Sequence, residues 1–139
     1  MKNYKRLGSV AAVLGLTAAG MALSAGTAQA ASYNGACGSG YSVIDSMNVV
    51  DGTVYLTYNA SNGYNCVVTV TNTPGTPDVM GANLRLSRND NVWTSTEEDS
   101  GTYSYYAGPL YKYAPNSCID WGGRVASNYT RINYDDHCG

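Results

Sequence analysis

Residues 53–70, TVYLTYNASNGYNCVVTV, decide the fold of this chain. Two runs rich in β-branched and aromatic residues, 53–59 and 65–71, flank Ser61-Asn62-Gly63, a pattern typical of a β-hairpin. A three-residue loop with Gly63 in the left-handed conformation gathers the apolar residues on one face, whereas a two-residue Asn62-Gly63 turn does not. The expected register pairs Tyr58 with Cys66, Leu56 with Val68 and Val54 with Val70, so that Cys66 faces the core.

The remainder of the chain after residue 30 follows the same pattern. No segment shows a helical period, and short alternating runs separated by Gly, Pro, Asn and Asp recur about every ten residues. The sequence therefore predicts an all-β fold, a small antiparallel β-sandwich or barrel stapled by two disulfides. The expected strands are residues 41–46, 53–59, 65–71, 79–87, 102–106, 109–113, 118–126 and 129–134.

Two of these runs carry the clearest facial patterns. In 79–87 every second residue from Met80 to Leu86 is apolar and the alternate positions are polar, which predicts one face in the core and one in water. In 118–126, Trp121 shares a face with apolar neighbours, so we expect it to pack on the core near a disulfide. The adjacent Gly122 and Gly123 permit a bulge or a close backbone approach.

The first thirty residues differ from the rest. Lys2, Lys5 and Arg6 precede an uncharged run rich in Ala, Val, Leu and Gly, and Ala28-Gln29-Ala30 ends it with small residues. This arrangement predicts a secretory signal peptide over 1–30 and a single mature β-domain over 31–139. The glycines make the apolar run too weak for a membrane span, so we expect none in the mature chain and an extracellular location.

Four cysteines lie after the predicted cleavage point, and in a secreted chain they indicate two disulfides, with three possible connectivities. We favour Cys37–Cys66 and Cys118–Cys138, because each ties one end of the chain to a strand. Zinc is the alternative, but the chain has no CxxC pair and His137 is its only histidine, so no metal site is expected.

The mature chain carries five basic residues against ten acidic ones, a formal charge of −5. This balance argues against nucleic acid as a partner, because phosphate binding needs a basic surface. No motif for a cofactor is present, and we expect none.

The chain has no Phe, and five of its tyrosines fall within eleven residues: Tyr103, Tyr105, Tyr106, Tyr111 and Tyr113. An exposed row of tyrosines would stack on sugars or adsorb to a polymer wall. The alternative is the more ordinary role, in which tyrosine replaces Phe as the aromatic residue of the strands.

Candidate polar sites are sparse. Asp90, Glu97, Glu98 and Asp99 surround Trp93 and could hold calcium, but the EF-hand spacing is absent. A ribonuclease-like trio of Glu97 or Glu98 with Arg124 and His137, or a glycosidase pair of Asp120 and Glu98, would supply acid–base chemistry. No spacing demands either arrangement, and no Gly-x-Ser-x-Gly elbow supports a serine triad with His137, so no catalytic residue is assigned.

The chain resembles the spore-associated protein A family of filamentous actinomycetes. The matching stretches are ACGSGYSVIDS (36–46), TVYLTYNASNGYNCVVTV (53–70), SYYAGPLY (104–111), CIDWGG (118–123) and the closing HCG. The resemblance implies a small exported protein found with spores or aerial hyphae, and it implies no catalytic residue.

Three functions remain open from the sequence. The leading hypothesis is an exported, non-enzymatic domain that associates with the spore or cell-wall surface. The second is a secreted inhibitor of an extracellular hydrolase, with residues 89–101 as the protruding loop and a secreted protein as its partner. The third is a small secreted hydrolase that uses Glu98, Arg124 and His137.

Overall fold

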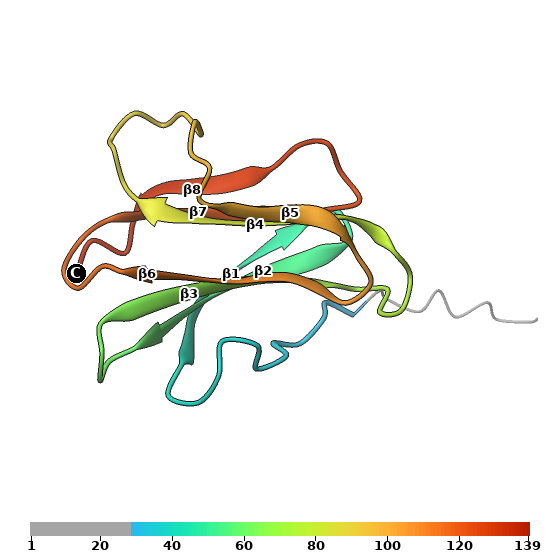
Figure 1. Ribbon diagram of the computed structural model, residues 1–139, viewed down its shortest axis with the longest axis horizontal. Coiled ribbons are helices and arrows are strands. Elements are labelled where there is room, and N and C mark those ends of the chain that lie inside the picture. The colour runs from blue at the N-terminus through green and yellow to red at the C-terminus, as the bar shows by residue number, and fades with distance from the viewer. Residues whose placement is uncertain (1–28) are drawn as a thin grey trace, which may run out of the picture.

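The computed structural model describes residues 29–139, so that the predicted signal peptide lies outside the described residues except for its last two. Eight strands form two four-stranded antiparallel sheets that face each other (Figure 1). The strands are β1 Ser42–Val49, β2 Gly52–Asn59, β3 Tyr64–Thr71, β4 Asp78–Leu86, β5 Glu98–Tyr103, β6 Tyr106–Tyr113, β7 Ile119–Val125 and β8 Arg131–Asp136. The predicted all-β class is confirmed, and of the two predicted architectures the fold is the sandwich.

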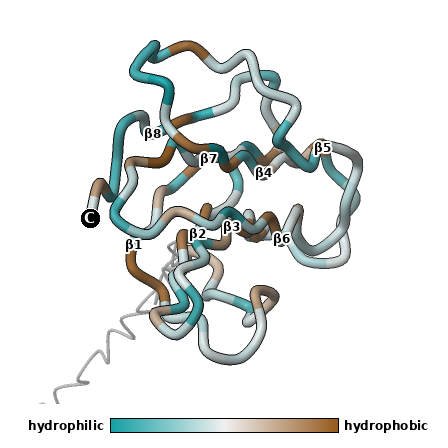
Figure 2. Tube along the Cα trace, turned by 60° about the vertical axis from the view of Figure 1, so that its left-hand side comes forward, coloured by the Kyte–Doolittle hydropathy of each residue, from teal (hydrophilic) through white to brown (hydrophobic). Residues whose placement is uncertain are grey.

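The first sheet has the order β1-β2-β3-β6 and the second the order β5-β4-β7-β8, and the two rows of strands are visible in Figure 2. The chain crosses from one sheet to the other between β3 and β4, where Pro74 and Pro77 interrupt the strands. It crosses again between β5 and β6 and between β6 and β7. Within residues 29–139 no helix is long and apolar enough to cross a membrane.

The register predicted for the β2–β3 hairpin is wrong by one residue. Leu56 lies opposite Val67, and Thr57 lies opposite Cys66. The loop has four residues because the backbone oxygen of Asn59 accepts hydrogen bonds from the N–H groups of both Asn62 and Gly63. Gly63 is left-handed as expected, with φ of 75°.

The corrected register places Thr69 on the inner face of the first sheet. Its hydroxyl donates a 2.8 Å hydrogen bond to the backbone oxygen of Gly81 in β4, so this buried polar residue links the two sheets. Cys66 moves to the outer face of the first sheet. It is nevertheless fully buried, because the segment before β1 covers it.

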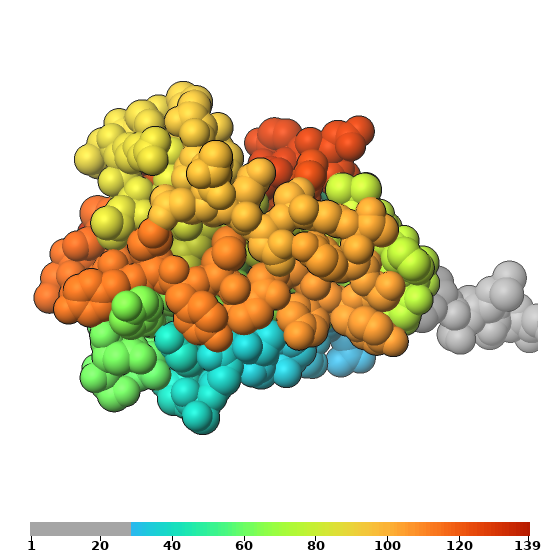
Figure 3. All heavy atoms as spheres, viewed as in Figure 1, coloured from blue at the N-terminus to red at the C-terminus, as the bar shows by residue number. Residues whose placement is uncertain are grey.

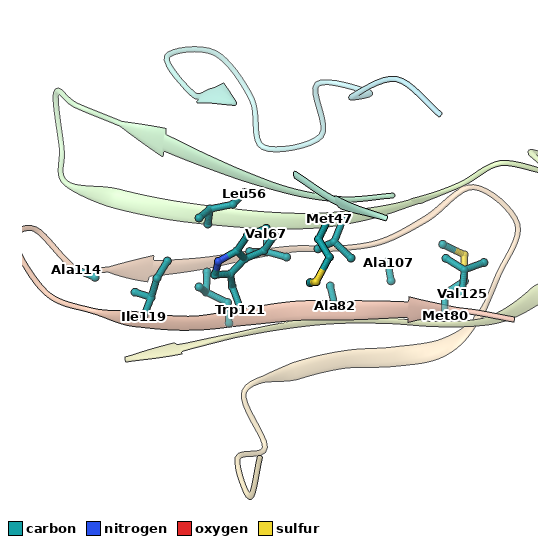
Figure 4. Close-up of a cluster of buried hydrophobic side chains, with 12 residues drawn as sticks. Met47, Leu56, Val67, Met80, Ala82, Ala107, Ala114, Ile119, Trp121 and Val125 are labelled. Carbon is teal, nitrogen blue, oxygen red and sulfur yellow. The ribbon is translucent and has the colours of Figure 1, made fainter. Parts of the chain in front are cut away.

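The main core lies between the sheets, and Figure 4 shows Trp121 near its centre beside Leu56 and Val67. Trp121 is fully buried as predicted, and its indole N–H donates to Asp136 at 2.9 Å. A Cβ at Gly122 would lie 1.9 Å from the backbone oxygen of Arg131. Glycine at this position therefore allows the close approach of β7 and β8 that the sequence suggested.

Both predicted disulfides are present, Cys37–Cys66 and Cys118–Cys138. The first fastens the segment before β1 to the outer face of the first sheet, where a second apolar cluster forms around Val68 and Val70. The second joins the residue before β7 to the residues after β8. The chain has no free cysteine among the described residues.

The outer face of β4 is not exposed to water as the alternation predicted. Arg85 is fully buried, whereas Leu86 is 46% exposed at the end of the strand. The loop between β4 and β5 folds over this face and supplies Asp90 and the oxygen of Val92 as partners for Arg85. A contact with this loop, which strand periodicity does not encode, has therefore buried an arginine that was expected to face water.

Candidate functional site

The surface with the most distinctive chemistry is the outer face of β6, the edge strand of the first sheet. Tyr106, Tyr111 and Tyr113 lie opposite Val70, Cys66 and Tyr64 of β3, which places all three side chains on the outer face. With Tyr105 in the turn before β6, they form what we call the tyrosine face. Their exposed fractions run from 41% for Tyr106 to 61% for Tyr105.

A β-bulge explains how these tyrosines come to share one side. Tyr106 and Tyr111 are five residues apart, so in a regular strand they would point to opposite faces. The register between β3 and β6 shifts at Gly108 and Pro109, and the extra residue returns Tyr111 to the outer face. Gly108 is required there because a Cβ would lie 2.7 Å from the backbone oxygen of Val67.

The tyrosine face continues into the aromatic residues of neighbouring segments. The ring of Tyr111 packs edge-on against Tyr41 with centroids 5.6 Å apart, and its hydroxyl donates to the oxygen of Cys37 at 3.0 Å. Tyr113 packs on Tyr64 at 5.4 Å. Partial burial, with a smaller effect of Tyr41, raises the pKa of Tyr111, so its hydroxyl stays protonated. These contacts orient the rings of Tyr111 and Tyr113.

One end of the tyrosine face opens into a groove of about 530 Å³. Tyr105 and Tyr106 form one wall, and the amides of Asn34 and Asn72 lie among the other lining groups. Asn72 also accepts a 2.8 Å hydrogen bond from the backbone nitrogen of Ala31, which holds this residue beside the groove. Aromatic rings next to neutral amides match the chemistry of sugars.

Tyr103 does not belong to this surface. It lies opposite Asp78 on the inner side of β5 and packs against the main core. Its hydroxyl donates to Asp99 at 2.5 Å, and this hydrogen bond, with burial and the carboxylate charge, raises the pKa of Tyr103. Of the five tyrosines that the sequence singled out, the other four form the tyrosine face. The segment that carries β5 and β6, orange in Figure 3, lies at the surface of the molecule.

The acidic residues around Trp93 do not converge on a common point. Asp90 pairs with Arg85, Glu97 with Lys112, and Glu98 accepts from the amide of Asn83. Asp99 accepts from the hydroxyl of Tyr103 and from the N–H of Gly108 at 2.7 Å. Each carboxylate has its own protein partner, and the arrangement does not support the calcium site that the sequence raised.

The residues of the two catalytic alternatives are also dispersed. Arg124 donates to Ser100 on the outer face of the second sheet, near the end of β7. His137 follows β8 beside the opposite end of β7 and contacts Asp45 and Asp136. Asp120 is buried in an ion pair with Arg85, at 2.7 Å from its Nε. The structure brings together neither the ribonuclease-like trio nor an accessible pair of Asp120 and Glu98.

Spore-associated protein A of Streptomyces coelicolor is 43% identical to this chain, over 96% of the chain and 88% of the relative. The chain belongs to the spore-associated protein A family. No protein-family model and no solved structure matches it. The relative is named for association with spores, and its name specifies no enzymatic activity. This family and the two disulfides are consistent with a surface or extracellular location for its members.

The sequence pattern did not predict two polar features of this family member, the burial of Arg85 and the contact of Asp45 with His137. Arg85 was counted as a solvent-facing residue, although it is the most buried charge of the second sheet. Asp45 was not considered, because 92 positions separate it from His137, whose ring nitrogen lies 3.1 Å from its carboxylate. The sequence shows that Asp136 and His137 are adjacent, but no pattern in it places Asp45 beside them.

Proposed function

We propose that this protein is exported and associates with the spore or hyphal surface through the tyrosine face, without catalysing a reaction. The observation that carries the proposal is the exposed, ordered row of tyrosines on an edge strand of a member of a family named for spores. The predicted signal peptide and the two disulfides support export. The dispersed positions of the acid–base candidates support a non-enzymatic role.

The physical basis of the proposal is contact between rigid aromatic rings and a polymer surface. Tyrosine offers a large apolar area and a hydroxyl with few rotatable bonds, so little conformational entropy is lost on contact. The mature chain carries a formal charge of −5, which disfavours attraction to anionic polymers. We therefore propose that a neutral glycan of the surface layer is the partner.

The localisation is tested by fractionating a sporulating culture of the source organism and assaying washed spores, hyphae and medium with an antibody. We expect the protein on washed spores or hyphae. Recovery only as free monomer in the medium would contradict the proposal.

The role of the tyrosine face is tested with purified protein and washed spores. Replacing Tyr105 and Tyr106 by Ser removes two exposed rings without touching either disulfide, and each ring contributes roughly 0.5–1.5 kcal/mol. Together the two losses amount to about 1–3 kcal/mol, so the apparent affinity should fall by a factor of about 5 to 140. Tyr129→Ser is the matched control, because Tyr129 is 78% exposed and lies in the loop between β7 and β8, outside the tyrosine face. Equal losses in both variants would exclude a specific role for the tyrosine face.

A second candidate is the secreted inhibitor, with the loop between β4 and β5 as its binding element. The loop stands out from the second sheet in Figure 1, and its Val92 is 55% exposed. Arg85 holds the middle of the loop through Asp90 and the backbone oxygen of Val92, which lowers the entropy lost on binding. Screening against secreted proteases and amylases decides this candidate, and the absence of inhibition at micromolar concentrations would remove it.

A further inference from the structure

A cluster of three metal-ligating side chains lies at the open edge of the sandwich, away from the tyrosine face. His137 Nε2 is 3.1 Å from Asp45 Oδ2 and 3.6 Å from Asp136 Oδ2, and the ligand atoms of all three residues lie within 4.8 Å of one another. Among the described residues no other group of this kind forms. We propose that Asp45, Asp136 and His137 bind one divalent metal ion, with Zn²⁺ as the best-matched ion.

Two β-bulges bring the carboxylates together, one in β1 of the first sheet and one in β8 of the second. Ile44 is an extra residue in β1, and directly after it Asp45 lies opposite Leu56 of the core. In β8 the register shifts so that Asp136 lies opposite Ile119. Residues that oppose core side chains share their face, so both aspartates point to the inner side of the sandwich edge.

Hydrogen bonds from the backbone and from Trp121 orient the two carboxylates. The second oxygen of Asp45 accepts from the N–H of Ser46 at 2.7 Å. Asp136 accepts from the indole of Trp121 and from the N–H of His137, both at 2.9 Å. Metal-binding carboxylates are commonly fixed in this way by outer partners. Trp121 thus connects the cluster to the rigid core.

The charge of the cluster is not balanced by the protein. No Lys or Arg of residues 29–139 forms a salt bridge with Asp45 or Asp136, and one imidazole faces two carboxylates. The side chains of Asp45 and Asp136 are 40% and 34% exposed, and two carboxylates this close repel each other unless a positive charge lies between them. A divalent cation would neutralise both and would join β1 of the first sheet to the end of β8 in the second.

The donor set and its spacing favour zinc. Bonds of 2.0–2.2 Å in a tetrahedral site place ligand atoms about 3.3–3.6 Å apart. The distances from His137 Nε2 to the two carboxylate oxygens, 3.1 Å and 3.6 Å, agree with this range to within a few tenths of an ångström. Imidazole with carboxylates suits zinc better than Mg²⁺ or Ca²⁺, which prefer oxygen alone. Three protein ligands leave a fourth position for water, and beside His137 lies a cavity of about 460 Å³.

The test uses the exported protein, stripped with a chelator and then titrated with Zn²⁺ by calorimetry and with Co²⁺ by visible spectroscopy. We expect one ion per chain and the absorption bands of tetrahedral Co²⁺. His137→Ala and, more conservatively, Asp45→Asn should each weaken binding at least about tenfold, because each removes one of three ligands. Asp78→Asn, a carboxylate outside the cluster, is the matched control and should bind as the wild type does.

His137 is the only histidine of the chain, which makes the test decisive. Circular dichroism and a count of free thiols on each variant show whether it is folded with both disulfides. Absence of saturable binding to the wild type would overturn the proposal. Binding that the folded His137→Ala and Asp45→Asn variants retain in full would also overturn it, because the ion would then lie elsewhere on the surface.

Discussion

Replacing Arg85 by Met tests whether a buried ion pair holds the second sheet and its long loop together. The Arg85 side chain is fully buried, and its Nε donates to Asp120 at 2.7 Å. Its Nη2 donates to Asp90 at 2.8 Å and to the oxygen of Val92 at 2.9 Å, and the guanidinium lies 4.9 Å from the centre of the Trp93 ring. Burial alone would lower the pKa of Arg85, but the hydrogen bonds to Asp120 and Asp90 raise it overall, so the group is charged at every working pH.

The expected loss of stability comes from the buried carboxylate that the substitution leaves without a partner. Asp120 is 1% exposed, and without the guanidinium its charge is buried and uncompensated. Removing one partner of such a pair costs about 3–5 kcal/mol. A small domain has about 5–15 kcal/mol of stability in total, so Arg85→Met should lower the midpoint of urea denaturation by roughly 2 M.

The control is the double variant in which Asp120→Asn accompanies Arg85→Met. The neutral amide keeps an oxygen that accepts from the N–H of Asp135, which is 2.9 Å from Asp120 Oδ1 in the wild type. Because no buried charge is then left unpaired, the double variant should recover most of the lost stability. A loss below about 1 kcal/mol for Arg85→Met, or a double variant no more stable than the single one, would refute this account of the ion pair.

Three further predictions concern stability. Replacing Cys118 and Cys138 by Ala should cost about 2–5 kcal/mol in urea denaturation, since their bridge spans 20 residues; an unchanged midpoint would contradict this. Gly122→Ala should cost about 1–3 kcal/mol or more because its Cβ would lie 1.9 Å from the backbone oxygen of Arg131. Gly81→Ala should cost less, because its closest contact is the flexible side chain of Arg124 at 3.3 Å and its nearest backbone atom is an ordinary 3.7 Å away. The hydrogen bond from Val92, helped by Arg85, lowers the pKa of Asp90 below 3.8, so its stabilising contribution is present above that pH and is lost on further acidification. Asp90→Asn should therefore lose less stability than the wild type between about pH 5 and pH 2.

The strand pattern of this chain was readable because most strands have one face in the core. The expected 79–87 strand corresponds to Asp78–Leu86, and 53–59 to Gly52–Asn59. The strand expected at 102–106 lies instead at Glu98–Tyr103. There the charged residues Glu98 and Asp99 pair with β4 and have side-chain partners of their own, so hydrophobic alternation gave no signal.

The parts that sequence reasoning missed depend on features with no periodicity. The hairpin register turned on whether the loop has three or four residues, which the hydrogen bonds of Asn59 decide. The burial of Arg85 depends on a loop that returns over its own strand. The cluster of Asp45 and His137 depends on a bulge and on the packing of strands far apart in the sequence. Hydrophobic periodicity shows which face of a strand is buried. The three features above depend instead on the length of a turn, the path of a loop and a bulge in an edge strand, which leave no periodic signal.

The position of the tyrosine face follows from how a short chain covers a two-layer sandwich. Two sheets bury their inner faces against each other, and the outer faces then need other cover. The segment before β1, fastened by Cys37, covers part of the first sheet, and the loop fastened by Arg85 covers part of the second. The segment before β1 covers the outer side of β6, the edge strand beyond β3, only in part. It contacts Tyr111 through Tyr41 and the oxygen of Cys37, and the outward tyrosines of β6 stay 41–56% exposed. The outward residues of β6 must therefore be stable both in water and against apolar neighbours. Tyrosine meets both demands, and this property also suits β6 to contact a surface outside the molecule.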